Sequence, residues 1–336
     1  MNFRKLPRLT ARAAVLALAV LCARVQSAVE LPATAITDDT YVVAKMSMAK
    51  LDPASLEASA KVILGANIAM AQEGLTKYKA KYDDYVSTGA ESVTIVMSGD
   101  PSQGKEPEPV VYIKMKAGSD HKALEDKIKA EQAKEGKPQE TEISNDGDFM
   151  VMRKKGTALP TAGSADRAKS FMDLLGAGDR AFVLSFIPND KVRAQMKEKL
   201  KADPSQPAWM QTLSPFMADS KSVVLEAKIG DAPNLGVSVT AADEASAKGI
   251  SDAVVQGSQQ LKEHAGQMKQ AGPQFAGMAD AFNSLADALK PAQSGSKVEL
   301  SIDGKVVGPA VSNLLPLMMM GAGGGGPRPA QRNPGQ

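Results

Sequence analysis

Residues 145–148, Asn-Asp-Gly-Asp, gather three oxygen-bearing side chains around a glycine, as calcium-binding loops do. Such a loop also needs carboxylates further along the chain, including a bidentate glutamate, and the sequence places none there. Asp-Gly is also a dipeptide that supplies the positive φ angles of a two-residue hairpin turn. We therefore interpret this stretch as a tight turn between two strands and expect no metal site in it.

Ser119 and Lys122 have the S-x-x-K spacing of serine acylases. That chemistry also uses a Ser-Asp-Asn element and a Lys-Thr-Gly strand, and the sequence contains neither. Ser119 is better explained as the cap of a helix, because a serine side chain at that position accepts a hydrogen bond from a backbone amide.

His121 and His264 stand in separate helical stretches, and neither has an HxxxH or HxxE partner that would suggest zinc. Asp38-Asp39 and Asp83-Asp84 are paired acids, for which solvated charge is the simplest interpretation. These residues are expected to lie on the surface without a catalytic role.

The C-terminal region offers two further patterns. Three consecutive methionines, Met318 to Met320, could bind Cu(I), but neighbours on a helix point in different directions, so residues 311–320 are better explained as an amphipathic segment packing on the preceding unit. Residues 321–326 satisfy G-x-G-x-x-G, but no strand precedes them and prolines follow. We expect no catalytic, cofactor-binding or metal-binding residues, and no cofactor.

Export is predicted by the first 27 residues. Four basic residues precede an apolar run at 13–23, which is too short to span a bilayer but typical of a signal peptide. Cleavage is expected after Ser27 or Ala28. Cys22 follows the bulky Leu21, which argues against a lipoprotein. The expected location is periplasmic, cell-surface or secreted.

Removal of residues 1–27 changes the charge and the cysteine count. The segment holds five of the 40 basic residues and none of the 38 acidic ones, so the remainder has 35 basic residues and a net charge of −3. The single cysteine is removed as well, so no disulfide is expected. A basic field for nucleic acid is absent from this remainder.

Strand and helix signals recur in the same order in both halves of the chain. Residues 92–101 align with 222–233, Val111 with Leu235, and residues 142–151 with 299–308. This alignment makes Asp146-Gly147 and Asp303-Gly304 equivalent hairpin turns, and it indicates an internal duplication. The expected strands are 40–48, 92–99, 110–116, two around 145–148, 180–187, 222–229, 234–241, 297–302 and 305–308. The expected helical stretches are 53–85, 119–134, 164–176, 189–217, 243–271 and 273–289.

The order of elements predicts an α+β fold with two tandem ferredoxin-like (split βαβ) units, each an antiparallel-rich sheet with helices on one face. The units are assigned to residues 36–155 and 179–320. A linker with a connecting helix occupies 156–178, and a Gly/Pro-rich tail at 321–336 is expected to be disordered.

The pattern resembles uncharacterised exported proteins of the planctomycete type. Those proteins carry a signal peptide and strands such as "DTYVVAKM" (39–46) and "DRAFVLSFIP" (179–188) ahead of helices. The resemblance covers most of residues 36–320 and implies a duplicated α+β architecture, but no activity.

Three functions are compatible with these observations. The first is a non-catalytic binding or structural protein that acts by surface contact, with a protein partner or self-association through the long helices at 243–271 and 273–289. The second is a hydrolase with an acid or Ser-Lys site in a groove between the two units. The third is a carrier of apolar ligands.

Overall fold

The computed structural model describes most of the chain between residues 31 and 308. The described residues are 31–32, 34–99, 108–134, 140–157, 159, 162–176, 180–199, 217–272 and 275–308. The predicted signal peptide, the three methionines at 318–320 and the predicted tail at 321–336 lie outside them.

The first half of the chain contains five strands and several helices. They are β1 (Thr40–Ser47), η2 (Met48–Lys50), α2 (Pro53–Leu64), η3 (Gly65–Ala71), α3 (Gln72–Val86), β2 (Ala90–Ser98), β3 (Val110–Met115), α4 (His121–Lys134), β4 (Thr141–Asp146) and β5 (Phe149–Lys154).

The second half repeats the arrangement after a connecting helix, α5. Its elements are α5 (Ala165–Gly176), β6 (Phe182–Phe186), α6 (Asp190–Lys199), β7 (Ser222–Lys228), β8 (Asn234–Thr240), α8 (Glu244–Ala271), α9 (Ala276–Ala288), β9 (Ala292–Ser294) and β10 (Lys297–Asp303).

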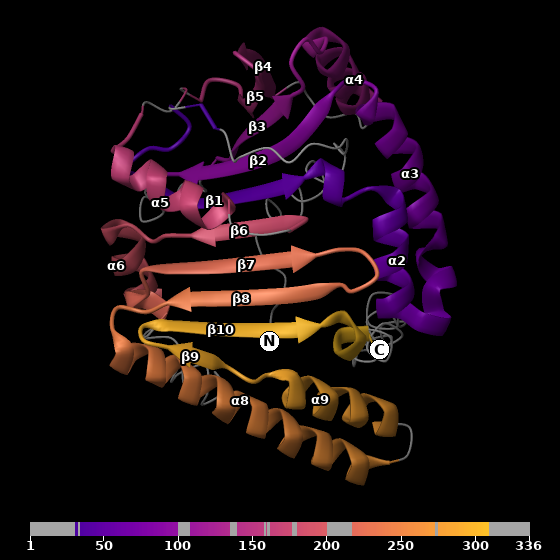
Figure 1. The fold of residues 1–336 in the computed structure, drawn as a ribbon, viewed down its shortest axis with the longest axis vertical. Coiled ribbons are helices and arrows are strands. Elements are labelled where there is room, and N and C mark those ends of the chain that lie inside the picture. Colours follow the sequence, from indigo (N-terminus) through magenta and orange to yellow (C-terminus); the bar gives the residue numbers. More distant parts are fainter. Residues whose placement is uncertain are drawn as a thin grey trace, which may run out of the picture.

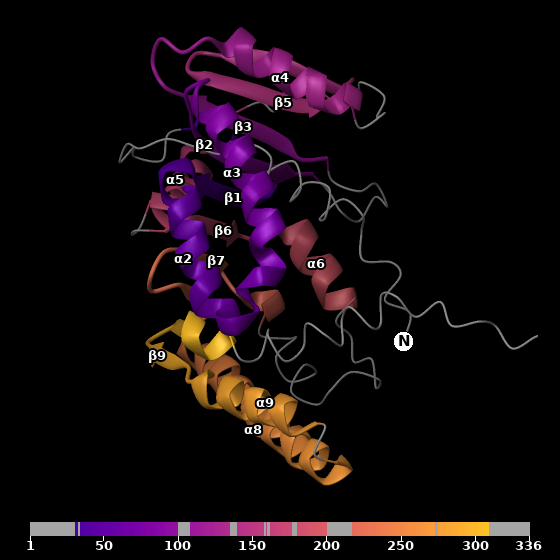
Figure 2. The same ribbon diagram turned by 90° about the vertical axis from the view of Figure 1, so that its right-hand side faces the viewer.

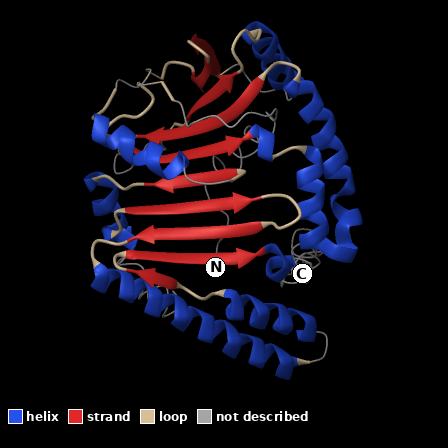
Figure 3. Ribbon diagram, in the orientation of Figure 1, coloured by secondary structure: helices blue, strands red, loops and turns tan. Residues whose placement is uncertain are grey.

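All these strands form one sheet (Figures 1 and 3), in the order β4-β5-β3-β2-β1-β6-β7-β8-β10-β9. Each neighbouring pair is antiparallel. The predicted α+β class is confirmed. The expectation of two separate sheets is wrong, because β1 and β6 pair with each other and so remove the free edge that each half would otherwise expose.

The ferredoxin-like topology is not observed either. In a split βαβ unit the two strands joined by the first helical connection run parallel, with another strand between them, whereas β1 here is the direct antiparallel neighbour of β2. The cause is the connection between them: α2 and α3 form a helical hairpin that leaves and re-enters the sheet at the same end. The two helices lie side by side across the strand ends (Figure 2).

The central pair, β1 with β6, joins the halves. Val42–Met46 pair with Phe182–Phe186, and two further backbone bonds extend the ladder: the Ser47 amide donates to Ala181 (2.9 Å) and the Ile187 amide to Tyr41 (2.9 Å). The centre of this ladder is Ala44 opposite Leu184.

Helix α5 lies against this central pair (Figure 1). The Arg167 guanidinium donates to the carbonyl oxygen of Thr40 at the start of β1 and to that of Ile187 after β6 (2.6 Å). At the start of α5, the Asp38 carboxylate accepts a hydrogen bond from the Ser164 amide (2.8 Å), which holds the pKa of Asp38 below its usual value. Burial lowers the pKa of Arg167, and the charge of Asp38 opposes that effect.

The apolar side of α5 defines one face of the sheet, named here the α5 face. Phe171 and Leu175 are buried in a cluster with Val43, Val183 and Val224, which come from both halves of the chain. The two halves therefore share a core. The other face, named here the opposite face, packs in the first half against η2, α3 and α4, and in the second half against α8 through Ala247 and Ile250.

A second contact also crosses between the halves. Ser59 of α2 donates through its hydroxyl to the carbonyl of Gly230 (3.1 Å) and accepts from the Gly230 amide (2.7 Å) in the turn between β7 and β8.

Along one row of the opposite face, every register position is apolar. The row crosses nine strands through Ile143, Met152, Val111, Ile95, Ala44, Leu184, Leu225, Val237 and Leu300.

The predicted turn at Asp146-Gly147 is confirmed, since Gly147 has a φ of 57° between β4 and β5. The equivalence with Asp303-Gly304 is wrong. Residues 304–308 are helical rather than a strand, and the Asp303 carboxylate accepts from the Lys305 amide (2.8 Å) as a cap. The corresponding turn is at Gly295, with a φ of 55° between β9 and β10.

Three further helix assignments are refined. The stretch 53–85 bends at Gly65, which has a φ of 50° and ends α2. The side chain that accepts from the first amides of α4 belongs to Asp120 rather than Ser119. Of the predicted helical stretch 189–217, the part at 200–216 lies outside the described residues.

Replacing Arg167 by methionine is expected to lower the free energy of unfolding by about 1–2 kcal/mol, because two half-buried carbonyl groups lose a charged donor. Urea denaturation would measure this. Lys169→Met in the same helix is the control: its side chain is 71% exposed and pairs with Asp173, so a change below about 0.5 kcal/mol is expected. Equal effects of the two substitutions would contradict the role given to Arg167.

Candidate functional site

In the second half, the α5 face of the sheet is polar. Alternate residues of each strand point to it, and the cross-strand register aligns them with the apolar cluster under α5. Most of these positions carry polar groups: Ser222, Glu226 and Lys228 on β7; Asn234, Ser238 and Thr240 on β8; Lys297, Glu299, Ser301 and Asp303 on β10.

The matching positions of the first half are apolar. Counterparts in the two halves can be found by following the strand register outward from the central Ala44–Leu184 pair. By this register, Val96 corresponds to Glu226, Tyr112 to Ser238, and Val151 to Glu299. Val96, Tyr112 and Val151 are buried in the cluster that includes Phe171 of α5. Figure 1 shows no described helix in front of β7, β8 and β10. The same sheet face is therefore a core in one half and an accessible polar surface in the other.

This polar surface contains a hollow of about 250 Å³, named here the sheet hollow. Asp173 and Leu174 of α5 form one wall, and Arg180 lies just before β6. The floor and the remaining wall come from three strands, through Val224, Glu226, Gly236, Val237, Ser238, Thr240, Lys297, Glu299, Leu300 and Ser301.

An ion pair lies across the floor of the sheet hollow. Arg180 Nη2 is 2.6 Å from Glu226 Oε2, and the two side chains are 21% and 23% exposed. A Cβ atom on Gly236 would lie 2.6 Å from Cγ of Glu226. Gly236 therefore leaves the space into which the Glu226 side chain folds, and it positions the carboxylate beside Arg180.

The other ionic groups of the sheet hollow are paired as well. Lys297 contacts Glu299 on the same strand, and Asp173 accepts from Lys169 (2.5 Å). The hydroxyl groups of Ser238 and Ser301 also line the hollow. Asn234 donates to Ser301 (2.9 Å). Each glutamate of the sheet hollow therefore contacts a cation.

The residues considered for chemistry in the sequence lie apart from the sheet hollow. Lys122 pairs with Asp126 one turn along α4 (3.2 Å), and His121 contacts Asn145 (3.1 Å). Asp84 accepts from Lys127 (2.8 Å) and so joins α3 to α4.

Among the described residues, no three His, Cys, Asp or Glu side chains gather as a metal site would require. His264 is exposed on α8, where it contacts Gln267 (3.3 Å).

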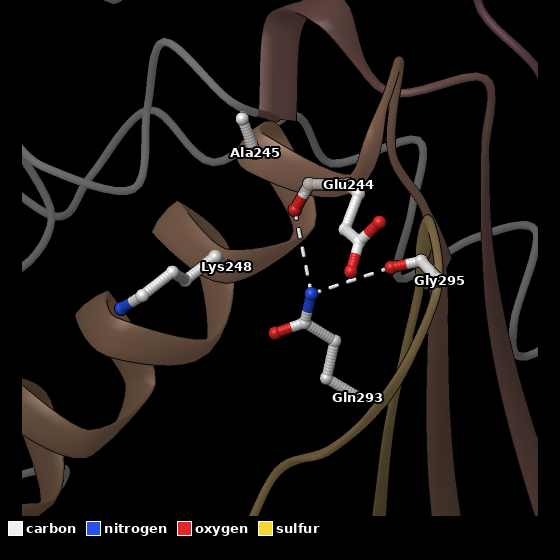
Figure 4. Close-up of a pocket in the computed structure, with 5 residues that line it drawn as sticks. All are labelled: Glu244, Ala245, Lys248, Gln293 and Gly295. Carbon is white, nitrogen blue, oxygen red and sulfur yellow. Dashed lines mark hydrogen bonds between the residues drawn. The ribbon is translucent and has the colours of Figure 1, made fainter.

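A second depression lies where α8 begins, lined by Glu244, Ala245, Lys248, Gln293 and Gly295 (Figure 4). Gln293 donates to the carbonyl oxygens of Glu244 and Gly295, both at 3.3 Å. Lys248 points away from this amide and pairs with Asp252 (2.6 Å). These contacts fasten the helix to the β9–β10 turn, which explains the polar groups here without a ligand.

Sequence reasoning missed the sheet hollow, although a signal existed. Asn234, Gly236, Ser238 and Thr240 alternate with apolar residues, which predicted a half-buried strand. The signal lies in the comparison with β3, where Val110 and Tyr112 occupy the same side as Gly236 and Ser238. That comparison requires the strand register.

Comparisons with protein-family profiles, with curated proteins and with solved structures gave no match for this chain. Among the described residues, the helices are too short or too polar to cross a membrane.

Gly236→Ala is expected to destabilise the protein by about 1–2 kcal/mol, because the added methyl group would overlap Glu226. Combining it with Glu226→Ala should recover part of that loss, which a double-mutant cycle from urea denaturation would measure. Gly266→Ala in α8, where a Cβ meets no atom within 4 Å, is the control and should be neutral or stabilising. Strict additivity of the two substitutions would show that Gly236 does not act through Glu226.

Proposed function

We propose that this protein is an exported, non-catalytic binding protein that acts by surface contact through the sheet hollow and the polar strands around it. The observation that carries the proposal is the contrast between the two halves: one sheet face is core in the first half and an accessible, charged, hydroxyl-rich surface in the second. Burial of polar groups without partners is unfavourable for folding, so these groups stay accessible. An accessible surface of charged and hydroxyl groups is suited to recognition of a ligand or partner.

Two alternatives have less support. The predicted hydrolase would use a groove between the two units, but β1 and β6 join the halves edge to edge. A carrier of apolar ligands would need a space between the long helices and the sheet, but Ala247 and Ile250 of α8 are buried together with Val298 there. Self-association through α8 and α9 is a second contact mode, favoured by Val255 at 43% exposure on α8.

We also infer an internal duplication, though not of the ferredoxin-like kind. Counted from the centre outward, the strand orders β1-β2-β3-β5-β4 and β6-β7-β8-β10-β9 correspond. Val43 pairs with Ser185 and Lys45 with Val183, so a two-fold rotation about the Ala44–Leu184 pair exchanges the two strands in register. The same rotation matches Ile95 with Leu225. Gly147 and Gly295 correspond as well, which supports common ancestry of the halves.

Export predicts a processed N-terminus. Intact-mass spectrometry of the protein purified from its native cells should find Ala28 or Val29 as the first residue. A chain that retains Met1 in the exported fraction would contradict cleavage. A chain found only in the cytoplasm would contradict export and leave the binding surface to be tested separately.

Binding of a partner to the sheet hollow should protect the backbone amides of the surrounding strands from hydrogen exchange, a pattern named here the exchange footprint. When the protein is mixed with an extract of the exported fraction, amide hydrogen exchange should slow in residues 222–240 and 297–303. Residues 121–134 of α4 serve as the internal reference and should not change. Protection confined to α8 and α9 would favour self-association, and absence of protection in β7, β8 and β10 would refute the proposed surface.

A further inference from the structure

We propose that the sheet hollow binds a neutral saccharide, held by its hydroxyl groups over Gly236. This inference rests on the proposed function, because it assigns a ligand class to the same surface. It starts from the charges that line the hollow.

A charged ligand has no unmatched counter-charge in the sheet hollow. Arg180 is paired with Glu226, Lys297 with Glu299, and Asp173 with Lys169. The Arg180–Glu226 pair is the partly buried one, so a carboxylate or a phosphate that displaced Glu226 from Arg180 would leave a partly desolvated charge unpaired, which is unfavourable. A neutral ligand can instead bond to the outward atoms of each pair and leave the pairs intact.

The hollow is lined by both hydrogen-bond donors and acceptors. Arg180 and Lys297 donate, Glu226 and Glu299 accept, and the hydroxyls of Ser238 and Ser301 do both. The strands that carry these groups are about 4.8 Å apart. A sugar ring presents several hydroxyl groups, each able to donate and accept, so it can match this mixed pattern. Leu174, which is only partly buried, lines the same hollow and offers apolar contact for the C–H groups of a ring.

A peptide fits the site less well. Extended peptides usually bind at a sheet edge, where backbone groups are free to pair. The floor here is instead the interior of the sheet, where β8 is bonded to β7 on one side and to β10 on the other. A peptide would therefore have to bind through side-chain contacts alone.

The size of the hollow limits the ligand. Its volume of about 250 Å³ is below the range of about 300–1,000 Å³ that is typical of pockets for drug-sized molecules. It would hold one short part of a saccharide, and the rest of a chain would extend over the open strands.

Isothermal titration calorimetry of the full chain with maltotriose, cellotriose and N,N′,N″-triacetylchitotriose tests the proposal. We expect saturable binding of at least one sugar with a stoichiometry near one. Glu299→Gln should weaken it about tenfold, because a neutral amide oxygen accepts a weaker hydrogen bond than a carboxylate does, and Ser238→Ala should weaken it about fivefold, because the hydroxyl group is lost. Lys248→Gln, at the depression beside α8, is the matched control and should bind like the wild type. Thermal melting would verify that each variant is folded.

Trigalacturonate and trialanine serve as charged and peptide probes. Weaker binding of both than of the best neutral sugar is expected. Tighter binding of either would overturn the assignment, as would the absence of saturable binding with all three neutral sugars, or binding that Glu299→Gln does not affect. If the exchange footprint on β7, β8 and β10 is present while no sugar binds, the ligand class is wrong and the proposed function stands. If the footprint is absent too, both fail.

Discussion

The pairing of β1 with β6 is the interaction on which the rest of this structure depends. A five-stranded half on its own would expose β1 or β6 as an edge with unpaired backbone groups, and pairing the two edges satisfies both at once. Helix α5 secures the junction. Arg167 donates to a carbonyl group at the start of β1 and to one after the end of β6, which lie side by side because the strands are antiparallel. Phe171 is fully buried against residues of both halves. The halves therefore form one folding unit with a shared core.

The junction also bears on a difference between the two halves. One connecting helix is present among the described residues; it packs on β1 and β6, and Ala35 and Ile36 join it in the apolar cluster on the first-half side of the α5 face. Residues of that side are apolar, as Val96 and Val151 are. The counterparts Glu226 and Glu299 lie outside this cluster and are polar. The opposite face shows no such divergence, since its row of nine residues is apolar in both halves.

Most individual elements could be predicted from the sequence, but the assembly could not. Apolar residues at every second position identify β1, β2 and β6, because alternate side chains of a strand point to opposite faces of the sheet. Nothing local specifies that β1 and β6 should pair, because both are good edge strands whatever their partner. The turn at Asp303-Gly304 was misassigned for a related reason: Asp-Gly suits both a hairpin and a helix cap, and the fold decides between them. The three-residue strand β9 was too short to leave a periodic signal.

The sheet hollow illustrates the same limit at the level of function. Its chemistry depends on Glu226, Gly236 and Ser301, which come from three strands and share one row of the sheet only through the observed register. Its wall depends on α5, since Asp173 and Leu174 stand beside the hollow because Arg167 and Phe171 fix the helix over the central strands. If the two halves formed separate sheets, this helix would be a linker and the polar strands would lack a wall. The site therefore depends on the joining of the two halves in one sheet and belongs to neither half alone.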